Sequence, residues 1–392
     1  MSNINLDEEE QLKVNDLIVR FYTYEGIVKA VEKASLKIRK GETLGIVGET
    51  GSGKSVTALT ILALTPSPGR IEDGNILFRK RDNTVVDILK MNEPQLLKIR
   101  GKEISMIFQE PNAALDPVYR VGEQITEAIL AHRLEEMIKK SIEFIKNEKD
   151  NGQYDVWTGL EMWTYKKMLS NPSDIKLKII QKIPIIRSIV KRRLNQVIRQ
   201  EITELLRLME IPDPERVIDA YPHELSGGMQ QRIVIAIALA CSPLLLIADE
   251  PTTNLDVTVQ AQILDLINRL KEKFGSSVIY ITHDMGVVAE ISDRVAVMYA
   301  GSVVEVAPVK ELFRNPLHPY TKGLLESIPR PGSPLRSIPG TVPNLVNPPS
   351  GCRFHPRCPY MMEKCKDIVP RLVKVSKDHY VACLLYEGED GE

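Results

Sequence analysis

The sequence predicts an α/β fold built around a nucleotide-binding core, and three observations carry that prediction. Residues 43–47 (Thr-Leu-Gly-Ile-Val) form a short apolar run that is typical of a buried strand. A glycine-rich stretch of the form G-x-x-x-x-G-K-S follows at residues 48–55, and residues 56–62 then carry apolar side chains at helical spacing. Strand, loop and helix occur in the order that a phosphate-binding loop requires, which predicts a nucleoside triphosphatase.

The glycine-rich stretch has a defined chemistry. Its glycines let successive backbone N–H groups turn toward phosphate oxygens, its lysine adds a cation for the β- and γ-phosphates, and its serine hydroxyl is a ligand for Mg²⁺. The alternative is a glycine-rich turn with a chance lysine, which explains neither flanking segment. The residues predicted to bind the nucleotide here are Gly48, Glu49, Thr50, Gly51, Ser52, Gly53, Lys54, Ser55 and Val56.

Length and composition limit the other possibilities. The chain has 392 residues, enough for two or three domains, and its 51 basic and 52 acidic residues leave a net charge of -1. Since the net charge is close to zero, the protein has no excess positive charge to attract nucleic acid or an anionic bilayer. The first ten residues are acidic and polar and do not resemble a secretion signal, so we expect a cytoplasmic protein. The longest apolar stretch, residues 233–248, contains Ser242 and Pro243 and falls short of the ~20 residues of a spanning helix, so it predicts a buried helix, a turn and a buried strand.

The segments around the loop predict further strands. Residues 12–21 and 26–38 have the alternation of antiparallel strands, and residues 71–89 predict short strands with polar turns such as residues 72–75. Tyr22 or Tyr24 lies far enough upstream to fold over the site and stack on an adenine ring, and we take Tyr24 as the candidate. An aromatic side chain packed on a sheet is the equally open alternative.

Residues 103–108 predict another core strand, which delivers Gln109. Prolines make residues 110–117 a predicted loop, so a neutral amide stands where α/β sheets place their ligands. This side chain is suited to orienting a water molecule or contacting Mg²⁺.

From residue 131 to 200 the sequence is rich in Lys, Glu and Ile at helical period, and both tryptophans, Trp157 and Trp163, fall there. We interpret it as an inserted or enlarged helical region. It contains the basic run Lys191, Arg192 and Arg193, for which a solvated helix face is the simpler explanation and contact with a partner protein or lipid head groups the functional one.

Two later segments carry chemistry. Residues 225–232 (Leu-Ser-Gly-Gly-Met-Gln-Gln-Arg) predict a second anion-binding helix N-terminus, because an N-cap explains Ser226 but not the glycine pair. Residues 243–250 predict a strand that ends in two carboxylates. We assign Asp249 to Mg²⁺ and Glu250 to the general base that polarises water. A strand at residues 278–282 ends at His283, which is placed to hydrogen-bond the γ-phosphate.

Together these motifs resemble the ATP-binding subunits of ABC transporters, most closely those of oligopeptide/dipeptide importers. The phosphate loop, Gln109 as the Q-loop, residues 225–232 as the signature, residues 244–250 as the Walker B strand, Asp256 in the D-loop and His283 in the H-loop carry the resemblance. The narrower match rests on residues 107–111, 251–260 and 315–321 and on a cysteine-rich end. Asn254 stands where the family usually has alanine.

The resemblance implies an ABC-type P-loop NTPase with a RecA-like core, an antiparallel β subdomain and an enlarged helical subdomain, followed by a small Cys-rich metal-binding region. The expected nucleotide-binding domain spans residues 1–310, its helical subdomain about 110–235 with an insertion at about 134–200, and the C-terminal region spans 311–392. The expected catalytic residues are Glu250, His283 and Gln109, and Mg²⁺ would be held by Ser55, Gln109 and Asp249.

Subunits of this kind dimerise head to tail, so ATP on one phosphate loop is completed by the signature of the other subunit. The residues that would serve that purpose are Ser226, Gly227, Gly228, Gln230 and Asp256. The implied partners are a second ATPase subunit, a paralogue rather than an identical copy, two transmembrane permease subunits and, indirectly, an extracellular solute-binding protein. The protein would then lie at the cytoplasmic face of the cell membrane.

The resemblance implies an ATP-hydrolysing motor for uptake of oligopeptides or dipeptides. Related importers carry oligosaccharides or nickel, and these substrates remain alternatives. A soluble ABC ATPase acting on nucleic acid or ribosomes is a rival of another class. The chain contains neither a long coiled-coil insertion nor a second nucleotide module, and its near-neutral charge gives no nucleic-acid footprint.

The cysteines form two groups. Cys241 lies in an apolar helix and is predicted to belong to the core, whereas Cys352, Cys358, Cys365 and Cys383 lie together in a proline-rich end. Clustered thiols in a cytoplasmic chain favour a soft metal over disulfides, either zinc or an iron–sulfur cluster. The sequence has no C-x-x-C pair among these cysteines, which weakens the prediction of a zinc ribbon. The family has the Gly-Cys-x-Phe-x-Pro-Arg-Cys-Pro pattern of residues 351–359, which implies a 4Fe-4S cluster serving as a staple for the C-terminal tail. His355 would be a ligand only if a cysteine were not.

Overall fold

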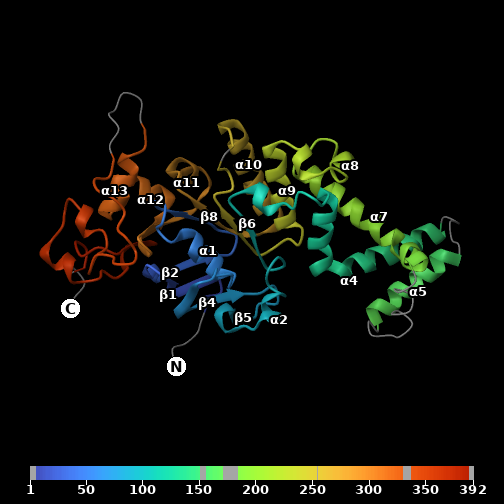
Figure 1. Ribbon diagram of the computed structural model, residues 1–392, viewed down its shortest axis with the longest axis horizontal. Helices are drawn as coiled ribbons and strands as arrows, with labels where there is room; N and C mark the ends of the chain where they lie inside the picture. The colour runs from blue at the N-terminus through green and yellow to red at the C-terminus, as the bar shows by residue number, and fades with distance from the viewer. Residues whose placement is uncertain (1–5, 151–155, 171–183, 254, 330–336, 388–392) are drawn as a thin grey trace. The chain divides into compact units, whose positions relative to one another are not determined.

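The computed structural model describes residues 6–150, 156–170, 184–253, 255–329 and 337–387. The chain forms two compact units. Figure 1 colours the chain by residue number from blue to red. The sheet unit comprises Met1–Gln109 and Ser242–Glu392, and the helical unit comprises Glu110–Cys241. Asn254, at which the sequence departs from the family pattern, lies outside the described residues.

An antiparallel sheet with strand order β2-β1-β4-β5 begins the sheet unit. It contains β1 (Glu10–Thr23), β2 (Gly26–Arg39), β4 (Gly69–Arg79) and β5 (Val85–Asp87), so the predicted antiparallel strands are confirmed. The polar turn predicted at residues 72–75 is wrong, because those residues lie inside β4. Gly74 has φ +107° there, and a Cβ on it would lie 2.7 Å from the Cα of Leu17. The glycine therefore marks an irregularity in the β1–β4 pairing, where the register shifts between Asn15 and Ile18, and not a chain reversal.

The second sheet of this unit is the core sheet, with strand order β11-β12-β10-β9-β3-β8-β7-β6. Strands β9, β3, β8, β7 and β6 run parallel to one another, as short apolar runs predict for strands covered on both faces, and β9 pairs with β10 antiparallel. The strands are β3 (Thr43–Val47), β6 (Ile104–Ile107), β7 (Leu245–Asp249), β8 (Ser277–Thr282), β9 (Arg294–Tyr299), β10 (Ser302–Pro308), β11 (Val373–Ser376) and β12 (His379–Val381).

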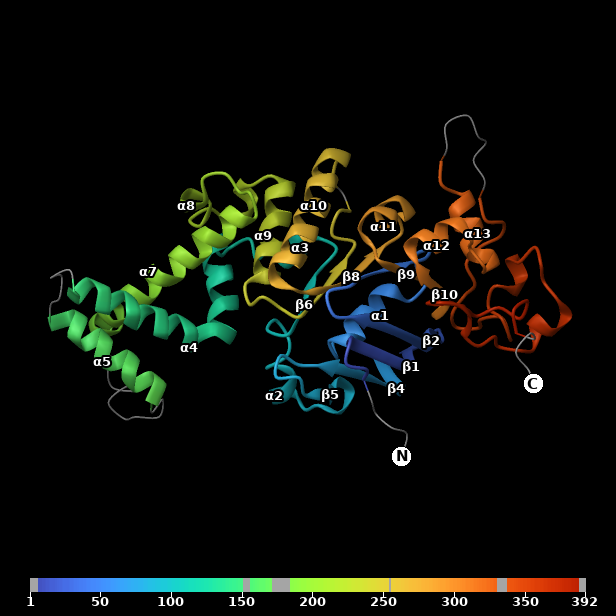
Figure 2. The same cartoon turned by 180° about the vertical axis from the view of Figure 1, so that it is seen from behind.

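Other elements cover both faces of the core sheet, as the alternating side chains of β9 show. Ala296 and Met298 pack in the core that contains the helix α1 (Lys54–Ile61) and the antiparallel sheet. Val295, Val297 and Tyr299 pack in a second core with α11 (Met285–Ile291). Figure 2 shows these helices from behind, together with α10 (Val257–Phe274). Residues that alternate along one strand thus belong to two different cores, which fixes the register of the sheet.

The C-terminal part of the chain extends the core sheet. After α12 (Val309–Arg314) and α13 (Pro319–Glu326) come the short helices η3 (His355–Arg357) and η4 (Glu363–Lys366). Strand β12 then pairs with β10, and β11 pairs with β12. The region at residues 311–392 therefore lies within the sheet unit and contributes two strands to it.

The helical unit contains seven described helical segments. They are α3 (Pro111–Ala114), α4 (Val121–Asp150), α5 (Val156–Ser170), α7 (Pro184–Leu208), α8 (Pro214–Val217), η2 (Pro222–Glu224) and α9 (Gly227–Leu239). The loop predicted at residues 110–117 contains the short helix α3, and α8 is a second short helix of this unit. Proline stands at the start of both, a position where the missing N–H costs nothing.

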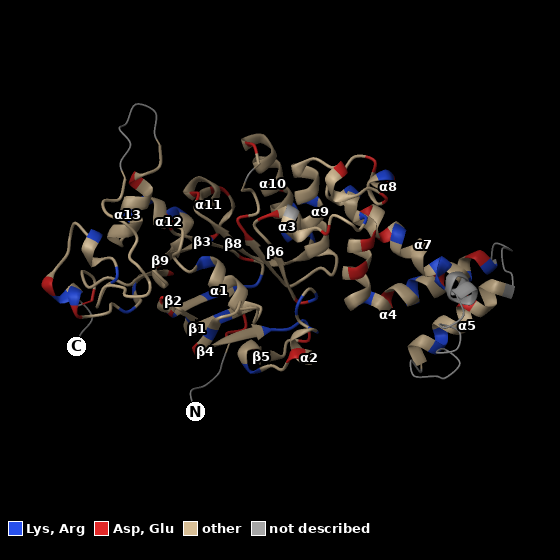
Figure 3. Cartoon of the chain, viewed as in Figure 1, with Lys and Arg blue, Asp and Glu red and all other residues tan. Residues whose placement is uncertain are grey.

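The enlarged helical region consists of the second half of α4, α5 and most of α7, and its residues 151–155 and 171–183 lie outside the described part. Basic and acidic residues both lie along α4 and α7 (Figure 3). Several of them pair between the two helices. Glu201 accepts from Arg133 and from Lys140 at 2.6 Å, and Arg193 pairs with Glu148 at 2.8 Å. In the basic run at residues 191–193, Arg193 is thus buried and paired, whereas the other two are exposed. No helix in the described ranges combines the length and apolar character needed to cross a bilayer.

Candidate nucleotide-binding site

The predicted site residues of the sheet unit follow neighbouring parallel strands. The glycine-rich loop follows β3, Gln109 follows β6, Asp249 ends β7 with Glu250 directly after it, and His283 follows β8. The pairing places Val47 opposite Thr282, and Asp249 opposite Ile281. Since the carboxyl ends of parallel strands share one edge of a sheet, this edge gathers the phosphate loop and the polar side chains.

The phosphate loop is shaped by its glycines and its lysine. Gly53 has φ +97° at the N-cap of α1, and a Cβ there would lie 2.6 Å from the carbonyl oxygen of Ala30, so only glycine fits. The Lys54 ammonium donates to the carbonyl oxygens of Gly48 at 2.7 Å and Glu49 at 3.1 Å. The backbone carbonyl groups of the loop therefore surround the Lys54 ammonium, and the start of α1 faces the sheet edge.

A hydroxyl and a carboxylate converge beside the loop. The Ser55 hydroxyl donates to Oδ1 of Asp249 at 3.1 Å. Burial raises the pKa of Asp249 and the charge of Glu250 adds to it, while the Ser55 hydrogen bond and Lys54 oppose the rise. Burial likewise lowers the pKa of Lys54, against the charges of Glu250, Asp249 and Glu49. A hard cation with oxygen ligands fits this pair, because it would supply the positive charge that the buried carboxylate lacks.

Glu250 is held by three side chains. Its Oε2 accepts from the Gln109 amide at 3.3 Å and from the Thr253 hydroxyl at 3.1 Å, and its Oε1 lies 3.2 Å from Nδ1 of His283. Its backbone has φ +46°, a strained conformation for glutamate that turns the side chain off the end of β7. The carboxylate is 16% exposed. A carboxylate fixed in this way beside a phosphate loop is placed to act on a water molecule.

Two other residues of the sheet unit that were predicted to contact the nucleotide, Tyr24 and Asp256, lie in the β1–β2 turn and at the start of α10. Tyr24 is 98% exposed in the turn between β1 and β2, and Tyr22 donates to Glu72 while Arg70 lies over its ring. Asp256 is the N-cap of α10 and accepts from Val259 N–H at 2.9 Å. Stacking of Tyr24 on adenine stays a prediction.

The signature residues lie in the helical unit. Ser226 is the N-cap of α9, accepts from the Met229 N–H, and Gly227 and Gly228 are the first residues of the helix. Gln230 is buried, and its amide donates to the carbonyl oxygen of Pro222 at 2.8 Å. Its amide nitrogen therefore holds the preceding turn against α9.

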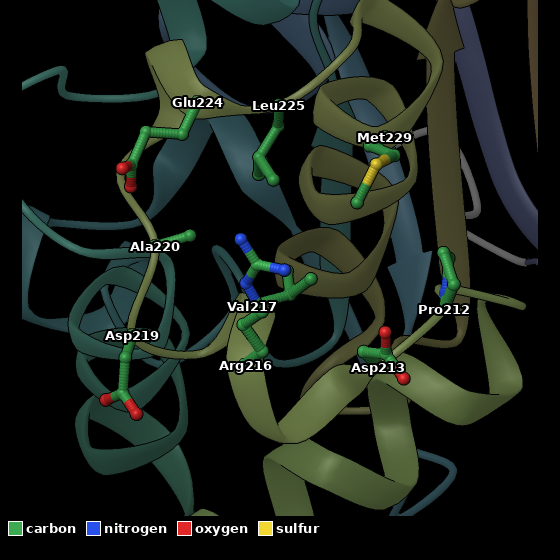
Figure 4. A pocket seen from close by; sticks show the side chains of 9 residues that line it. All are labelled: Pro212, Asp213, Arg216, Val217, Asp219, Ala220, Glu224, Leu225 and Met229. Carbon is green, nitrogen blue, oxygen red and sulfur yellow. The ribbon is translucent and has the colours of Figure 1, made fainter.

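A pocket of about 440 Å³ opens in the helical unit next to the signature (Figure 4). Leu225 and Met229 contribute apolar surface, and Asp213, Arg216, Asp219 and Glu224 are among the charged side chains around it. Leu225 and Met229 belong to the predicted signature, and the other residues that line the pocket lie outside the segments predicted to bind nucleotide.

The five cysteines are free thiols, and Cys241 is buried as predicted. Burial raises the pKa of Cys352 to about 11, and the charges of Cys383, Cys365 and Cys358 add to that rise. Within the part of the chain that the structure describes, no group of three or more His, Cys, Asp or Glu side chains is arranged to hold a metal ion. The predicted metal-binding character of the C-terminal region, as a 4Fe-4S cluster or zinc, is therefore not supported.

The sequence did not point to three residues that contact the site. Thr253 holds Glu250, and its place in the segment after the Walker B strand was the only signal. Arg357 and Tyr320 contact Glu49 of the phosphate loop from the C-terminal region, more than 270 positions away along the chain. Only the fold brings them together.

A phosphate loop, a strand-end carboxylate pair and a histidine at one edge of a parallel sheet define the class of P-loop nucleoside triphosphatases. Within that class, residues 31–253 match the model of the ABC transporter family, and residues 304–365 match the oligopeptide/dipeptide transporter C-terminal region. The chain belongs to the ABC transporter family and is an ATP-binding protein and an ATPase of it.

Individual proteins agree with this assignment. The chain is 43% identical over 385 residues to the oligopeptide transport ATP-binding protein AppD of Bacillus subtilis, covering 97% of this chain and 98% of that protein. It is 42% identical to the dipeptide transport ATP-binding protein DppD of the same organism, covering 97% and 96%. Among solved structures, a bacterial ABC transporter cassette solved as a dimer aligns with a TM-score of 0.52 at 24% identity, covering 76% of this chain and 98% of that one. The last likeness concerns the fold.

Proposed function

We propose that this chain is the ATP-hydrolysing motor subunit of an importer that takes up oligopeptides or dipeptides. The observation that carries the proposal is the set of four strand ends that gather the phosphate loop, Gln109, Asp249 with Glu250, and His283 at one edge of the core sheet. The relatives named for oligopeptide and dipeptide transport, which align over nearly the whole chain, support the choice of cargo.

The residues divide the chemistry among them. Lys54 and the N–H groups at the start of α1 bind the β- and γ-phosphates. Ser55 and Asp249 would hold Mg²⁺, which would supply positive charge against the developing phosphate charge. Glu250 takes the proton of the attacking water, because it is the carboxylate that Gln109 and Thr253 orient. His283 hydrogen-bonds the γ-phosphate. Its imidazole pairs with Glu250 in this structure and is 63% exposed, so it is free to turn toward a nucleotide.

The site is half of a shared one. Ser226 and Gly228 begin α9 and serve a nucleotide held by the second ATPase subunit, while that subunit's signature serves the nucleotide held here. ATP then favours the closed dimer, and hydrolysis releases it, which is coupling by differential affinity. The second ATPase subunit is a paralogue. The permease consists of two further transmembrane polypeptides, to which a solute-binding protein outside the cell delivers the cargo. The motor binds at the cytoplasmic face of the membrane.

Dimer-dependent turnover tests this proposal. Specific ATPase activity, measured over a range of protein concentrations and after adding the paralogous subunit, is expected to follow the dimer fraction determined by light scattering. The matched variant Ser226→Arg keeps the phosphate loop intact and is expected to bind ATP while losing turnover of the nucleotide held by its partner. Full activity in a proven monomer contradicts the shared site.

Uptake measurements test the cargo. Cells carrying Glu250→Gln in this subunit are expected to lose uptake of labelled dipeptides or oligopeptides. They are expected to keep uptake of oligosaccharides and nickel, the alternative cargoes. Loss of sugar or nickel uptake alone, with normal peptide uptake, excludes the peptide assignment.

The cysteine-rich end has a finer assignment that rests on its donor set. Four free thiols, at Cys352, Cys358, Cys365 and Cys383, suit a 4Fe-4S cluster which staples the tail, with zinc as the alternative. The absence of a metal-holding group among the described side chains speaks against it. Iron, sulfide and zinc analysis of anaerobically purified protein decides between them, since iron and sulfide at about four each per chain are expected for the cluster.

A further inference from the structure

The phosphate loop is contacted from the C-terminal region at Glu49. Both terminal nitrogens of Arg357 donate to the Glu49 carboxylate, at 2.8 and 3.1 Å, in a two-pronged pair. The hydroxyl of Tyr320 accepts the Glu49 backbone N–H at 2.9 Å. Side chain and backbone of one loop residue are therefore both fixed by residues that lie outside the nucleotide-binding motifs.

The contacting residues are themselves rigid. The Arg357 side chain is 5% exposed, and its Nε donates to the carbonyl oxygen of Pro339 at 2.8 Å. Its guanidinium lies over the rings of Tyr299 and Phe354, which pack against Tyr320 with ring centroids 4.6 and 5.4 Å away. Since these aromatic rings form one buried cluster, the guanidinium and the phenol hydroxyl hold a set distance from the loop.

A second connection reaches the other side of the loop. Arg353 donates to the carbonyl oxygen of Ala300, and the next residue, Gly301, donates its N–H to the carbonyl oxygen of Ser52 at 2.9 Å. Arg353 also pairs with Glu32 at 2.7 Å. The C-terminal region thus braces the loop at Glu49 directly and at Ser52 through the β9–β10 turn.

These contacts act on the lysine that binds phosphate. The Lys54 ammonium donates to the Glu49 carbonyl oxygen, so the backbone that Tyr320 holds is also the backbone that orients Lys54. Arg357 has an electrostatic effect as well. An unpaired Glu49 carboxylate in the loop would repel a triphosphate, and the guanidinium cancels that charge.

We propose that Arg357 and Tyr320 are positioning residues for ATP, through which the C-terminal region sets the shape and charge of the phosphate loop. The inference rests on the proposed motor function, since it concerns the same nucleotide site. It predicts that weakening these contacts lowers the affinity for MgATP and leaves the chemical step intact, because neither residue touches Glu250 or His283.

The experiment titrates MgATP into the full chain by calorimetry and measures KM and kcat for hydrolysis. Arg357→Gln is expected to weaken binding by about tenfold, the loss of one charge-assisted pair, with KM rising in step and kcat within about twofold. Arg357→Lys restores part of the affinity. Tyr320→Phe removes only the hydroxyl and is expected to weaken binding by about threefold, one neutral hydrogen bond.

The control is Asp378→Asn, which breaks the 2.6 Å pair with Arg39, a different link between the C-terminal region and β2. It is expected to leave ATP affinity unchanged. A double variant, Glu49→Gln with Arg357→Gln, is expected to bind ATP better than Arg357→Gln alone because no unpaired carboxylate remains in the loop.

Three results overturn the inference: ATP affinity within twofold of the parent in both Arg357→Gln and Tyr320→Phe, equal weakening in Asp378→Asn, or a fall in kcat at unchanged KM. If Arg357→Gln does not fold, Tyr320→Phe decides alone, by whether it weakens ATP binding by about threefold. Failure of the unaltered chain to bind MgATP refutes the motor function itself, whereas normal binding in every variant refutes only the positioning role.

Discussion

Nε2 of His379 lies 2.7 Å from Oε1 of Glu305, and both side chains are buried. The same carboxylate accepts the backbone N–H groups of Leu317 and His318, at 2.8 and 2.9 Å. One buried glutamate on β10 therefore joins β12 and the segment that leads into α13. This arrangement ties the C-terminal region to the core sheet, and it means that the carboxylate has no water to replace a lost partner.

Removing the imidazole should therefore cost stability. We expect His379→Ala to lower the free energy of unfolding by about 3 kcal/mol, because it leaves a buried carboxylate short of one partner. Urea denaturation followed by circular dichroism measures it. The neighbouring Asp378→Asn breaks a partly exposed pair and should cost no more than about 1 kcal/mol. Equal effects of the two variants would show that burial of Glu305 does not matter.

The stability of the chain should also fall in mild acid because of His318. Burial lowers the pKa of this imidazole from 6.5 to about 4, with Glu305 opposing the shift and Lys322 adding to it. Between those two values the unfolded chain binds a proton that the folded chain does not, so stability decreases as pH falls through 6.5 and levels off near 4. The expected loss is about 3 kcal/mol over that range.

Denaturation at pH 7 and pH 5 in the parent and in His318→Asn separates this contribution from other titrating groups. Asparagine keeps an acceptor for the Tyr320 N–H, which Nδ1 of His318 takes at 3.0 Å, but does not titrate. The variant should show the smaller pH dependence. An identical pH dependence in both proteins would mean that His318 does not contribute.

Local sequence patterns locate the predicted nucleotide-site residues that share one edge of the core sheet, and they miss the residues that support the phosphate loop. Gly53, Lys54, Asp249 and Glu250 follow from local patterns, because each is fixed by its position at a strand end or helix start. Arg357 and Tyr320 are fixed by the aromatic cluster between α13 and η3, which no periodicity reveals. The same holds for Gly74, whose polar neighbours predict a turn although long-range pairing with β1 keeps it in a strand. Local patterns predict a residue's place where its neighbours in sequence determine it. They do not predict contacts between residues that lie far apart in the sequence.

Glu250 provides the sharpest test of the chemistry. Glu250→Gln should lower kcat by about 10² to 10⁴, the range for a lost general base, while ATP binding persists and a nucleotide-bound dimer accumulates. Thr253→Val is the matched variant, since it removes the hydroxyl that orients Glu250 and keeps the carboxylate. It should reduce kcat less. Turnover in Glu250→Gln equal to that of the parent would reassign the base.

The enlarged helical region gives a prediction about assembly. Trp157 and Trp163 are 50% and 37% exposed on α5, and large exposed apolar side chains often mark contact surfaces. We expect this region to contact the permease or the membrane surface. Replacing residues 145–196 by a short Gly-Ser linker removes it and keeps the Arg133 and Lys140 contacts with Glu201, so the stem of α4 and α7 should stay paired.

The shortened chain should fold and hydrolyse ATP, because the predicted catalytic side chains lie in the sheet unit. Co-purification with the permease and peptide uptake should both decrease. Replacing Trp157 and Trp163 by serine in the full-length chain should produce part of the same loss without shortening any helix. Normal assembly and uptake by the shortened chain would show that the extra helices have another role, since a surface that contributes binding free energy cannot be removed without weakening the complex.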